Sequence, residues 1–147
     1  MIGIIGAWMS VIATGLFAGG ALMQSIVDHP ARQSTEPAAA IGQMQATLKF
    51  ADPYMPILVL LGSVSMMVTY YCHNRTWHIA GAALLLFLII PFTLIFIFPV
   101  NKKMLTLSGA AHEHPAIRSL MRRWGWLHAV RSTMGCAALI AIVFQLV

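Results

Sequence analysis

The stretch that decides the fold class is residues 77–98, WHIAGAALLLFLIIPFTLIFIF, which contains no Asp, Glu, Lys or Arg. An α-helix needs about 20 apolar residues to cross the hydrocarbon core of a bilayer, which is about 30 Å thick. Three further apolar runs of similar length occupy residues 3–27, 54–72 and 124–147. Only helices and closed barrels satisfy their own backbone polar groups in lipid. Because the runs lack the alternation of barrel strands, the sequence predicts four transmembrane helices.

The composition agrees with a chain that is surrounded by a lipid bilayer. Of the 147 residues, 59% are hydrophobic and 9% are charged, whereas soluble domains have about 25% charged residues. The net charge of +5 comes from basic residues that lie between the apolar runs, so we expect no nucleic-acid partner. We predict an all-α fold, a single integral membrane domain over residues 1–147 built as a four-helix bundle, with long loops at 28–53 and 99–123.

The basic residues also predict the orientation, because Lys and Arg gather in cytoplasmic loops. The opposite short connection holds only Arg75, and the two long loops hold seven basic residues: Arg32, Lys49, Lys102, Lys103, Arg118, Arg122 and Arg123. We therefore expect both loops in the cytoplasm and both chain ends on the outer side of a plasma membrane, such as the inner membrane of a bacterium.

Prolines predict helices inside both long loops. Pro37 can begin a helix that places Ile41, Met44 and Leu48 on one face, and we expect this short helix to lie on the membrane surface. Pro115 is expected to open a helix that continues directly into the fourth span.

Within the spans, small residues and a proline predict local packing. Gly15 and Gly19 form a small-xxx-small pair on the first span, which predicts the close approach of a neighbouring helix. Pro91 lies inside the third span and predicts a kink there, because proline removes a helical hydrogen bond.

The polar residues with the clearest functional pattern begin the fourth span. Trp124, His128 and Arg131 are spaced i, i+4 and i+7, so they share one helical face. An arginine at this depth needs a partner, because burying a charge in hydrocarbon is costly. Asp28, at the end of the first span, is the best-placed carboxylate. We predict a site at the cytoplasmic ends of the helices, to which His29 and Asn101 also contribute.

Other roles remain open for the same residues. Arg131 could extend to lipid headgroups, with Asp28 as a simple ion-pair partner. His128 could be an interfacial hydrogen-bonding residue, and Asn101 could cap the third helix.

The sequence predicts no metal site and no cofactor. Residues 112–114, His-Glu-His, supply two imidazoles at most, and His73 and His78 flank a turn without further ligands. Cys72 and Cys136 fit neither a CxxC motif nor a zinc-like spacing.

Several of these motifs occur in one order that resembles a known family. Phe-Ala-Gly-Gly-Ala at 17–21 and Asp-His-Pro-Ala-Arg at 28–32 look like the first-helix signature of the anthrone oxygenase-like membrane proteins. Pro-Val-Asn at 99–101 resembles that family's motif at the end of the third helix. Trp124, His128 and Arg131 match its Trp-x-x-x-(His or Asn)-x-x-Arg motif.

The resemblance implies an oxygenase that converts an anthrone to an anthraquinone with molecular oxygen. On that analogy the substrate is a lipophilic aromatic or quinol-like molecule. His128 or His29 would remove a proton as a general base, and Arg131 and Asn101 would stabilise the resulting enolate. Asp28 is expected at the binding site, where Trp124 and Trp126 would form a stacking wall.

Two other kinds of function remain open at this stage. The chain could be a non-enzymatic membrane protein, either a subunit of a larger membrane partner or a binder of lipid or quinone. It could instead be a redox protein that binds haem or copper through His29 and His128. A homo-oligomer is compatible with each reading, whereas a transporter is disfavoured because no pair of broken helices occurs.

Overall fold

The computed structural model describes residues 1–51, 53–74, 76–107 and 114–144 and contains no strand within these ranges. Four helical segments in them are long and apolar enough to cross a membrane: Ile2–Gln33, Met55–Cys72, Trp77–Thr106 and Pro115–Phe144. The predicted all-α fold with four membrane-spanning helices is therefore confirmed.

Each segment consists of one or more helical elements. The first contains α1 (Ile2–Met23), the π-helical turn η1 (Gln24–Asp28) and α2 (His29–Gln33), and a separate helix, α3 (Pro37–Ala51), follows it. The second contains α4 (Met55–Thr69) and η2 (Tyr70–Asn74). The third contains α5 (Trp77–Phe87), α6 (Ile89–Phe92), η3 (Thr93–Ile97) and α7 (Phe98–Thr106), and the fourth is α8 (His114–Phe144).

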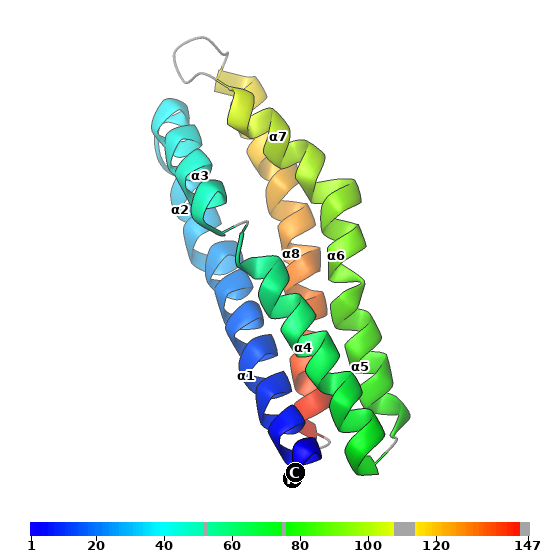
Figure 1. Ribbon diagram of the computed structural model, residues 1–147. Helices are drawn as coiled ribbons and strands as arrows, with labels where there is room; N and C mark the ends of the chain where they lie inside the picture. The colour runs from blue at the N-terminus through cyan, green and yellow to red at the C-terminus, as the bar shows by residue number, and fades with distance from the viewer. Residues whose placement is uncertain (52, 75, 108–113, 145–147) are drawn as a thin grey trace.

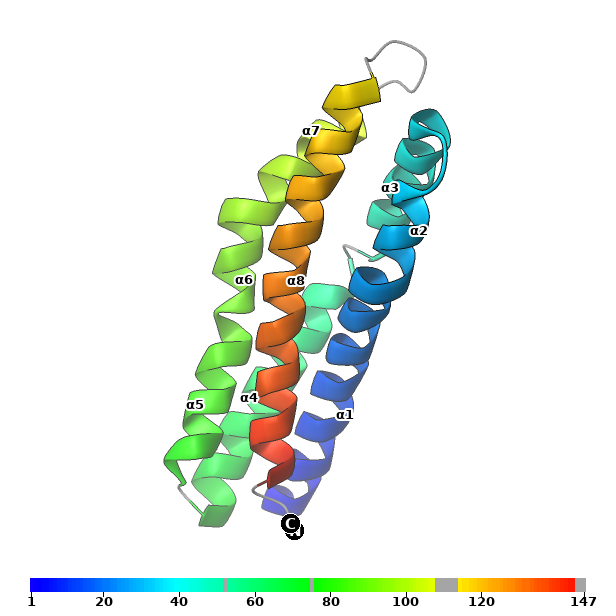
Figure 2. The ribbon, with the colours of Figure 1, turned by 180° about the vertical axis from the view of Figure 1, so that it is seen from behind.

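The spans run alternately up and down the bundle. In Figures 1 and 2, the beginning of α1 and the end of α8 lie at one end of the molecule, whereas α2, α3 and α7 lie at the other. α1 packs against α4 and α8, and α5 packs against the same two helices. Each helix of this square therefore has two antiparallel neighbours.

Three of the four spans are longer than a membrane requires. Met55–Cys72 has 18 residues, close to the hydrocarbon thickness, whereas the other spans have 30 to 32 residues and reach about 45–48 Å. They therefore continue past α4 at one end. We call α2, α3, α7 and residues 114–124 of α8 the extension, and α1, α4, α5, α6 and residues 125–144 of α8 the apolar bundle.

Each part has its own hydrophobic core. The bundle core includes Phe17, Val59, Met66, Leu86 and Ile142. The extension core joins α3, η3, α7 and α8 through Ile41, Met44, Leu48, Ile97, Val100, Met104, Ile117, Met121 and Trp124.

The extension corrects the prediction for the first loop and confirms the one for Pro115. α3 begins at Pro37 as expected, but Ile41, Met44 and Leu48 face α7 and α8, because these helices continue far enough to cover them. α3 is thus a packed element of the extension rather than a helix with its apolar face on the membrane. α8 begins beside Pro115 and continues without interruption through the fourth span, as predicted.

The local packing predictions had mixed outcomes. A Cβ added to Gly19 would meet no atom within 4 Å, and at Gly15 the nearest atom would be 3.9 Å away, so this pair does not mark the close approach. The first span instead comes closest to its neighbours at other glycines, such as Gly6, where a Cβ would lie 3.0 Å from Thr69 Oγ1. Around Pro91, where a kink was predicted, the helix is interrupted at Leu88 and becomes π-helical in η3.

Candidate functional site

Buried polar side chains gather where the two cores meet. Arg32 is 1% exposed, His128 0%, Asn101 4% and Arg131 8%. They come from α2, α7 and α8, so three of the four spans contribute to one cluster. Among the predicted site residues, the structure thus brings Asn101, His128 and Arg131 into one buried region.

His128 lies at the centre of a hydrogen-bonded group. Its Nε2 contacts Arg131 Nη2, and its Nδ1 lies 2.9 Å from Ser25 Oγ. Because a guanidinium only donates, Nε2 accepts from Arg131, and Nδ1 carries the proton that is donated to Ser25. Ser25 Oγ lies 2.9 Å from Ser132 Oγ, which is also 3.0 Å from the carbonyl oxygen of Ala21. The imidazole is therefore fixed on both sides.

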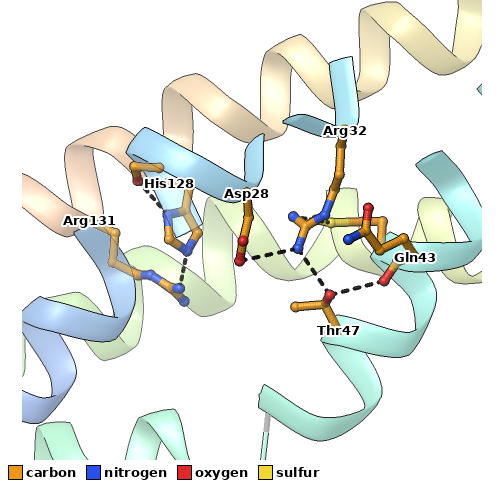
Figure 3. Close-up of polar contacts among 8 residues, drawn as sticks. Asp28, Arg32, Gln43, Thr47, His128 and Arg131 are labelled. Carbon is orange, nitrogen blue, oxygen red and sulfur yellow. Dashed lines mark hydrogen bonds and ion pairs between the residues drawn. The ribbon is translucent and has the colours of Figure 1, made fainter. Parts of the chain in front are cut away.

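Arg131 is held between the imidazole and an aromatic ring. Its guanidinium carbon lies 5.9 Å from the centroid of the Phe17 ring on α1, a cation–π distance. Asp28, which we predicted to pair with Arg131, pairs with Arg32 at 3.7 Å between Oδ2 and Nη2. Figure 3 shows Asp28 between the His128–Arg131 contact and the Arg32 side chain.

Arg32, which ends the Asp-His-Pro-Ala-Arg motif at 28–32 and was also counted as a loop charge, is a second buried guanidinium. Besides Asp28, it contacts two residues of α3: Nη2 donates to Thr47 Oγ1 at 3.0 Å, and Nη1 lies 3.3 Å from Met44 Sδ (Figure 3). The i, i+4 spacing of Asp28 and Arg32 is the signal that could have revealed this pair. The contribution of α3 had no sequence signal, because it depends on how the loop folds back.

Trp124 connects Asn101 to the two imidazoles. Its Nε1 donates to Asn101 Oδ1 at 2.9 Å, and its ring stacks on His128 with the centroids 4.4 Å apart. The His29 ring lies 5.8 Å from Trp124. A Cβ on Gly125 would lie 2.1 Å from His29 Nε2, so only glycine leaves room for that ring.

Trp126 does not join this group. Its side chain is 77% exposed, because two residues along a helix turn the side chain by roughly 200°. The predicted stacking wall of two tryptophans is therefore not formed by Trp124 and Trp126 together.

A cavity of about 260 Å³ opens beside Arg131. Its walls are mostly apolar, and its polar side chains are Thr93, Asn101 and Arg131. Apolar side chains from the first three spans complete it: Phe17, Met55, Pro56, Val59, Ile89, Ile90, Leu94 and Phe98. Neither His29 nor His128 is among the described residues that line it, so the two imidazoles predicted as bases do not face this space.

A smaller chamber adjoins the cavity on its polar side. It shares Met55, Asn101 and Arg131 with the cavity and is also lined by Gln24 and Thr47. Its volume of about 10 Å³ corresponds to about one water molecule. The cavity therefore has a lipid-like wall on one side and a polar end on the other.

Two π-helical turns border the site. η1 carries Ser25 and Asp28, and η3 carries Thr93 and Ile97. Both turns pack against α8. π-bulges often occur at functional sites, because the extra residue rotates the side chains that follow it.

The structure shows no group of three or more His, Cys, Asp or Glu side chains that could hold a metal ion in the part of the chain that it describes. The His-Glu-His motif bears on this only in part, since His112 and Glu113 lie outside the described residues.

The sequence profile of the anthrone oxygenase family matches residues 44–141 of this chain. The chain belongs to the anthrone oxygenase family. No curated protein and no solved structure matches the chain significantly. The match includes Asn101, Trp124, His128 and Arg131, whereas the first-span motifs at 17–21 and 28–32 precede it.

For this member of the anthrone oxygenase family, several residues around the site were missed from the sequence. Ser25, Thr47 and Ser132 all hold or surround the predicted residues. Serine and threonine are common in membrane helices, where they also bond to their own backbone, so their presence alone could not identify them.

Proposed function

We propose that the protein binds a lipophilic aromatic substrate in the cavity beside Arg131 and oxidises it with molecular oxygen. The observation that carries the proposal is the placement of Asn101 and Arg131 together on the wall of an otherwise apolar cavity. Apolar walls with a few convergent polar groups are typical of small-molecule sites. Family membership supports an anthrone-like substrate.

The chemistry starts from an aromatic ketone that has an acidic CH₂ group opposite its carbonyl. Loss of one proton gives an enolate, whose oxygen is stabilised by the Arg131 guanidinium and the Asn101 amide. The electron-rich carbon then reacts with O₂ to give a peroxide anion, which takes up a proton to form a hydroperoxide. Loss of water from the hydroperoxide leaves a second carbonyl, so one oxygen atom enters the product and the other leaves as water.

In this proposal His128 is a positioning residue. Its Nε2 accepts from Arg131, and its Nδ1 is engaged by Ser25, so the ring sets the direction of the guanidinium. This replaces the role of base that the sequence suggested for His128 or His29, because neither ring lines the cavity in the described structure. We propose that the proton leaves the cavity through the adjoining chamber, which has room for about one water molecule.

Substrate access is proposed to come from the lipid. Among the residues that line the cavity, Leu94 is 58% exposed, Phe98 is 52% exposed, and Pro56 is also exposed. They belong to α4 and to the third span, so the mouth lies between these helices. A lipophilic ketone dissolved in the bilayer would reach Arg131 without crossing water.

We further propose that the extension faces the cytoplasm. Its described surface has exposed basic residues: Lys49, Lys102, Lys103, Arg118, Arg122 and Arg123. This excess of Lys and Arg favours the cytoplasmic side and would place both chain ends on the outer side of a plasma membrane.

The proposal is tested by oxygen uptake of the purified protein supplied with anthrone, after subtraction of the uncatalysed rate. Arg131→Gln should lower the catalysed rate about 100-fold, because an oxyanion donor is lost. Arg123→Gln, at an exposed position away from the cavity, is the matched control and should leave the rate unchanged. A wild-type rate in Arg131→Gln would refute the assignment, and binding of anthrone without uptake would instead favour a binding protein.

The positioning role of His128 has its own test. His128→Ala should lower kcat at least tenfold with little change in KM, because the guanidinium remains but loses its orientation. His128→Gln should restore part of kcat, since its amide oxygen can accept from Arg131. An equal loss in both variants would contradict the positioning role.

A further inference from the structure

A second pocket lies at the far end of the extension, away from the aromatic cavity. It has a volume of about 510 Å³ and is formed by the end of α2, the beginning of α3 and the first turns of α8. Figures 1 and 2 show these three segments together at one end of the molecule. It shares no lining residue with the cavity beside Arg131.

Three arginines line this pocket, and its described lining includes no acidic residue. Arg32 is buried at 1% exposure, whereas Arg118 and Arg122 are exposed, so the pocket has a charged interior and a charged rim. Asp28 offsets part of the charge of Arg32 at 3.7 Å. The arginines belong to α2 and α8, which means that the fold brings their charges together despite mutual repulsion.

A hydrogen bond holds one of these charges in place, and another has a buried donor atom without a partner. Arg118 Nη1 donates to the backbone carbonyl of Gln33 at 3.1 Å. This hydrogen bond connects α8 to α2 at the rim of the pocket. Arg32 Nε is buried with no hydrogen-bond partner among the described residues. A buried donor without a partner is costly, and an anion in the pocket could lower that cost.

We propose that this pocket binds a phosphate group. Guanidinium groups bind phosphate oxygens through paired hydrogen bonds. Arg118 and Arg122 supply such groups at the rim, and Arg32 adds its positive charge and its unpartnered Nε from the interior. The volume exceeds that of a phosphate ion, so the group is carried by a larger molecule, either a soluble phosphorylated metabolite or an anionic phospholipid headgroup. This proposal is independent of the oxygenase reaction.

The depth of the pocket is compatible with both carriers. Arg118 precedes Gly125, where α8 enters the apolar bundle, by seven residues, or about 10 Å along the helix. Lipid headgroups occupy about 5–8 Å on each side of the hydrocarbon core. The pocket therefore lies at the boundary between headgroups and water.

The test uses the full-length protein in dodecyl maltoside, a detergent without phosphate. Inorganic phosphate is titrated calorimetrically in one arm, and phosphatidylglycerol is added and followed by native mass spectrometry in the other. We expect the double variant Arg118→Gln/Arg122→Gln to weaken binding at least about tenfold, because two charge-assisted contacts are lost. The double variant Lys102→Gln/Arg123→Gln removes the same charge from exposed positions outside the pocket and should weaken binding less than about twofold.

The two binding experiments distinguish a soluble phosphorylated ligand from a phospholipid headgroup. Saturable binding of inorganic phosphate that depends on Arg118 and Arg122 supports a soluble ligand, and binding of phosphatidylglycerol alone with the same dependence supports a headgroup. Binding of neither probe, or equal weakening by the two double variants, would overturn the proposal. Thermal unfolding of both variants checks their folding, and Arg122→Gln alone replaces the first pair if that pair does not fold.

Discussion

The apolar bundle and the extension are built from the same long helices but are packed in different ways. In the bundle, helices approach at small residues: a Cβ on Gly62 would lie 2.7 Å from Leu86 Cδ2, and a Cβ on Gly135 would lie 2.7 Å from Phe17 Cε1. In the extension, contacts are made by large side chains such as Met104 and Ile117. The exposed surfaces differ as well, being mainly apolar around the bundle and basic around the extension.

This difference follows from the solvent of each part. Lipid is as apolar as a leucine side chain, so helices inside it gain stability from close van der Waals contact between small residues. Outside the hydrocarbon core, burial of large apolar side chains is itself stabilising. The candidate site lies where these two modes of packing meet, which explains how buried arginines can stand next to an apolar cavity.

The largest effect that would sharpen the comparison is expected from truncating the extension core. Met104 is fully buried, and Met104→Ala should lower the free energy of unfolding by about 3 kcal/mol. Hydrogen exchange should show the loss in α3 and α7 while amides of α4 and α5 stay protected. Leu105→Ala, at a side chain that is 50% exposed, is the control. Equal loss of protection in the bundle would show that the two cores are one cooperative unit.

A smaller loss is expected where two helices of the bundle approach closely. Gly62→Val should cost about 2 kcal/mol through overpacking, since its Cβ would lie 2.8 Å from Thr14 Oγ1 as well as against Leu86. Unfolding with sodium dodecyl sulfate in maltoside micelles measures this cost. Gly81→Val adds the same side chain to α5 where a Cβ meets nothing within 4 Å. The packing account fails if these two variants are equally stable.

The smallest effect concerns a polar link that holds α3 to the extension. Gln45 Nε2 donates to the carbonyl oxygens of Met104 at 2.9 Å and Leu107 at 2.8 Å. Gln45→Ala should lower the free energy of unfolding by about 1 kcal/mol, whereas Gln43→Ala, at an exposed side chain on the same helix, should change it little. A larger effect at Gln43 would mean that the link is not what positions α3.

Much of the bundle could be predicted from the sequence, because the length of each apolar run reflects the thickness of the membrane's hydrocarbon core. The extension could not, since charged residues end an apolar run without ending a helix. Arg32 illustrates the problem: it marks the end of the first span in hydropathy, yet it lies buried against Thr47 of α3. Only the return of residues 37–51 onto the bundle creates that environment.

The site was predictable to the extent that it lies on a single helix. The spacing of Trp124, His128 and Arg131 gave their common face correctly, and the same helical register could have excluded Trp126. Contacts between helices were harder, because they depend on rotation and on π-turns that no local pattern indicates. The contacts that Arg32 makes with Met44 and Thr47 of α3 are such a case.

The central claim is that the cavity beside Arg131 holds the substrate, and filling it tests that claim most directly. Thr93 lines the cavity and is only half-buried, so Thr93→Trp can fill the space from η3 while the helix is retained. Ile95→Trp places the same side chain on the lipid-facing side, where Ile95 is 63% exposed. The unfolding temperatures of both variants are first compared with that of the wild type, to show that both variants are folded. Anthrone-dependent oxygen uptake is then measured for each of them. We expect Thr93→Trp to lower the rate of oxygen uptake by about tenfold or more and Ile95→Trp to leave it unchanged. Full activity in Thr93→Trp would contradict the account.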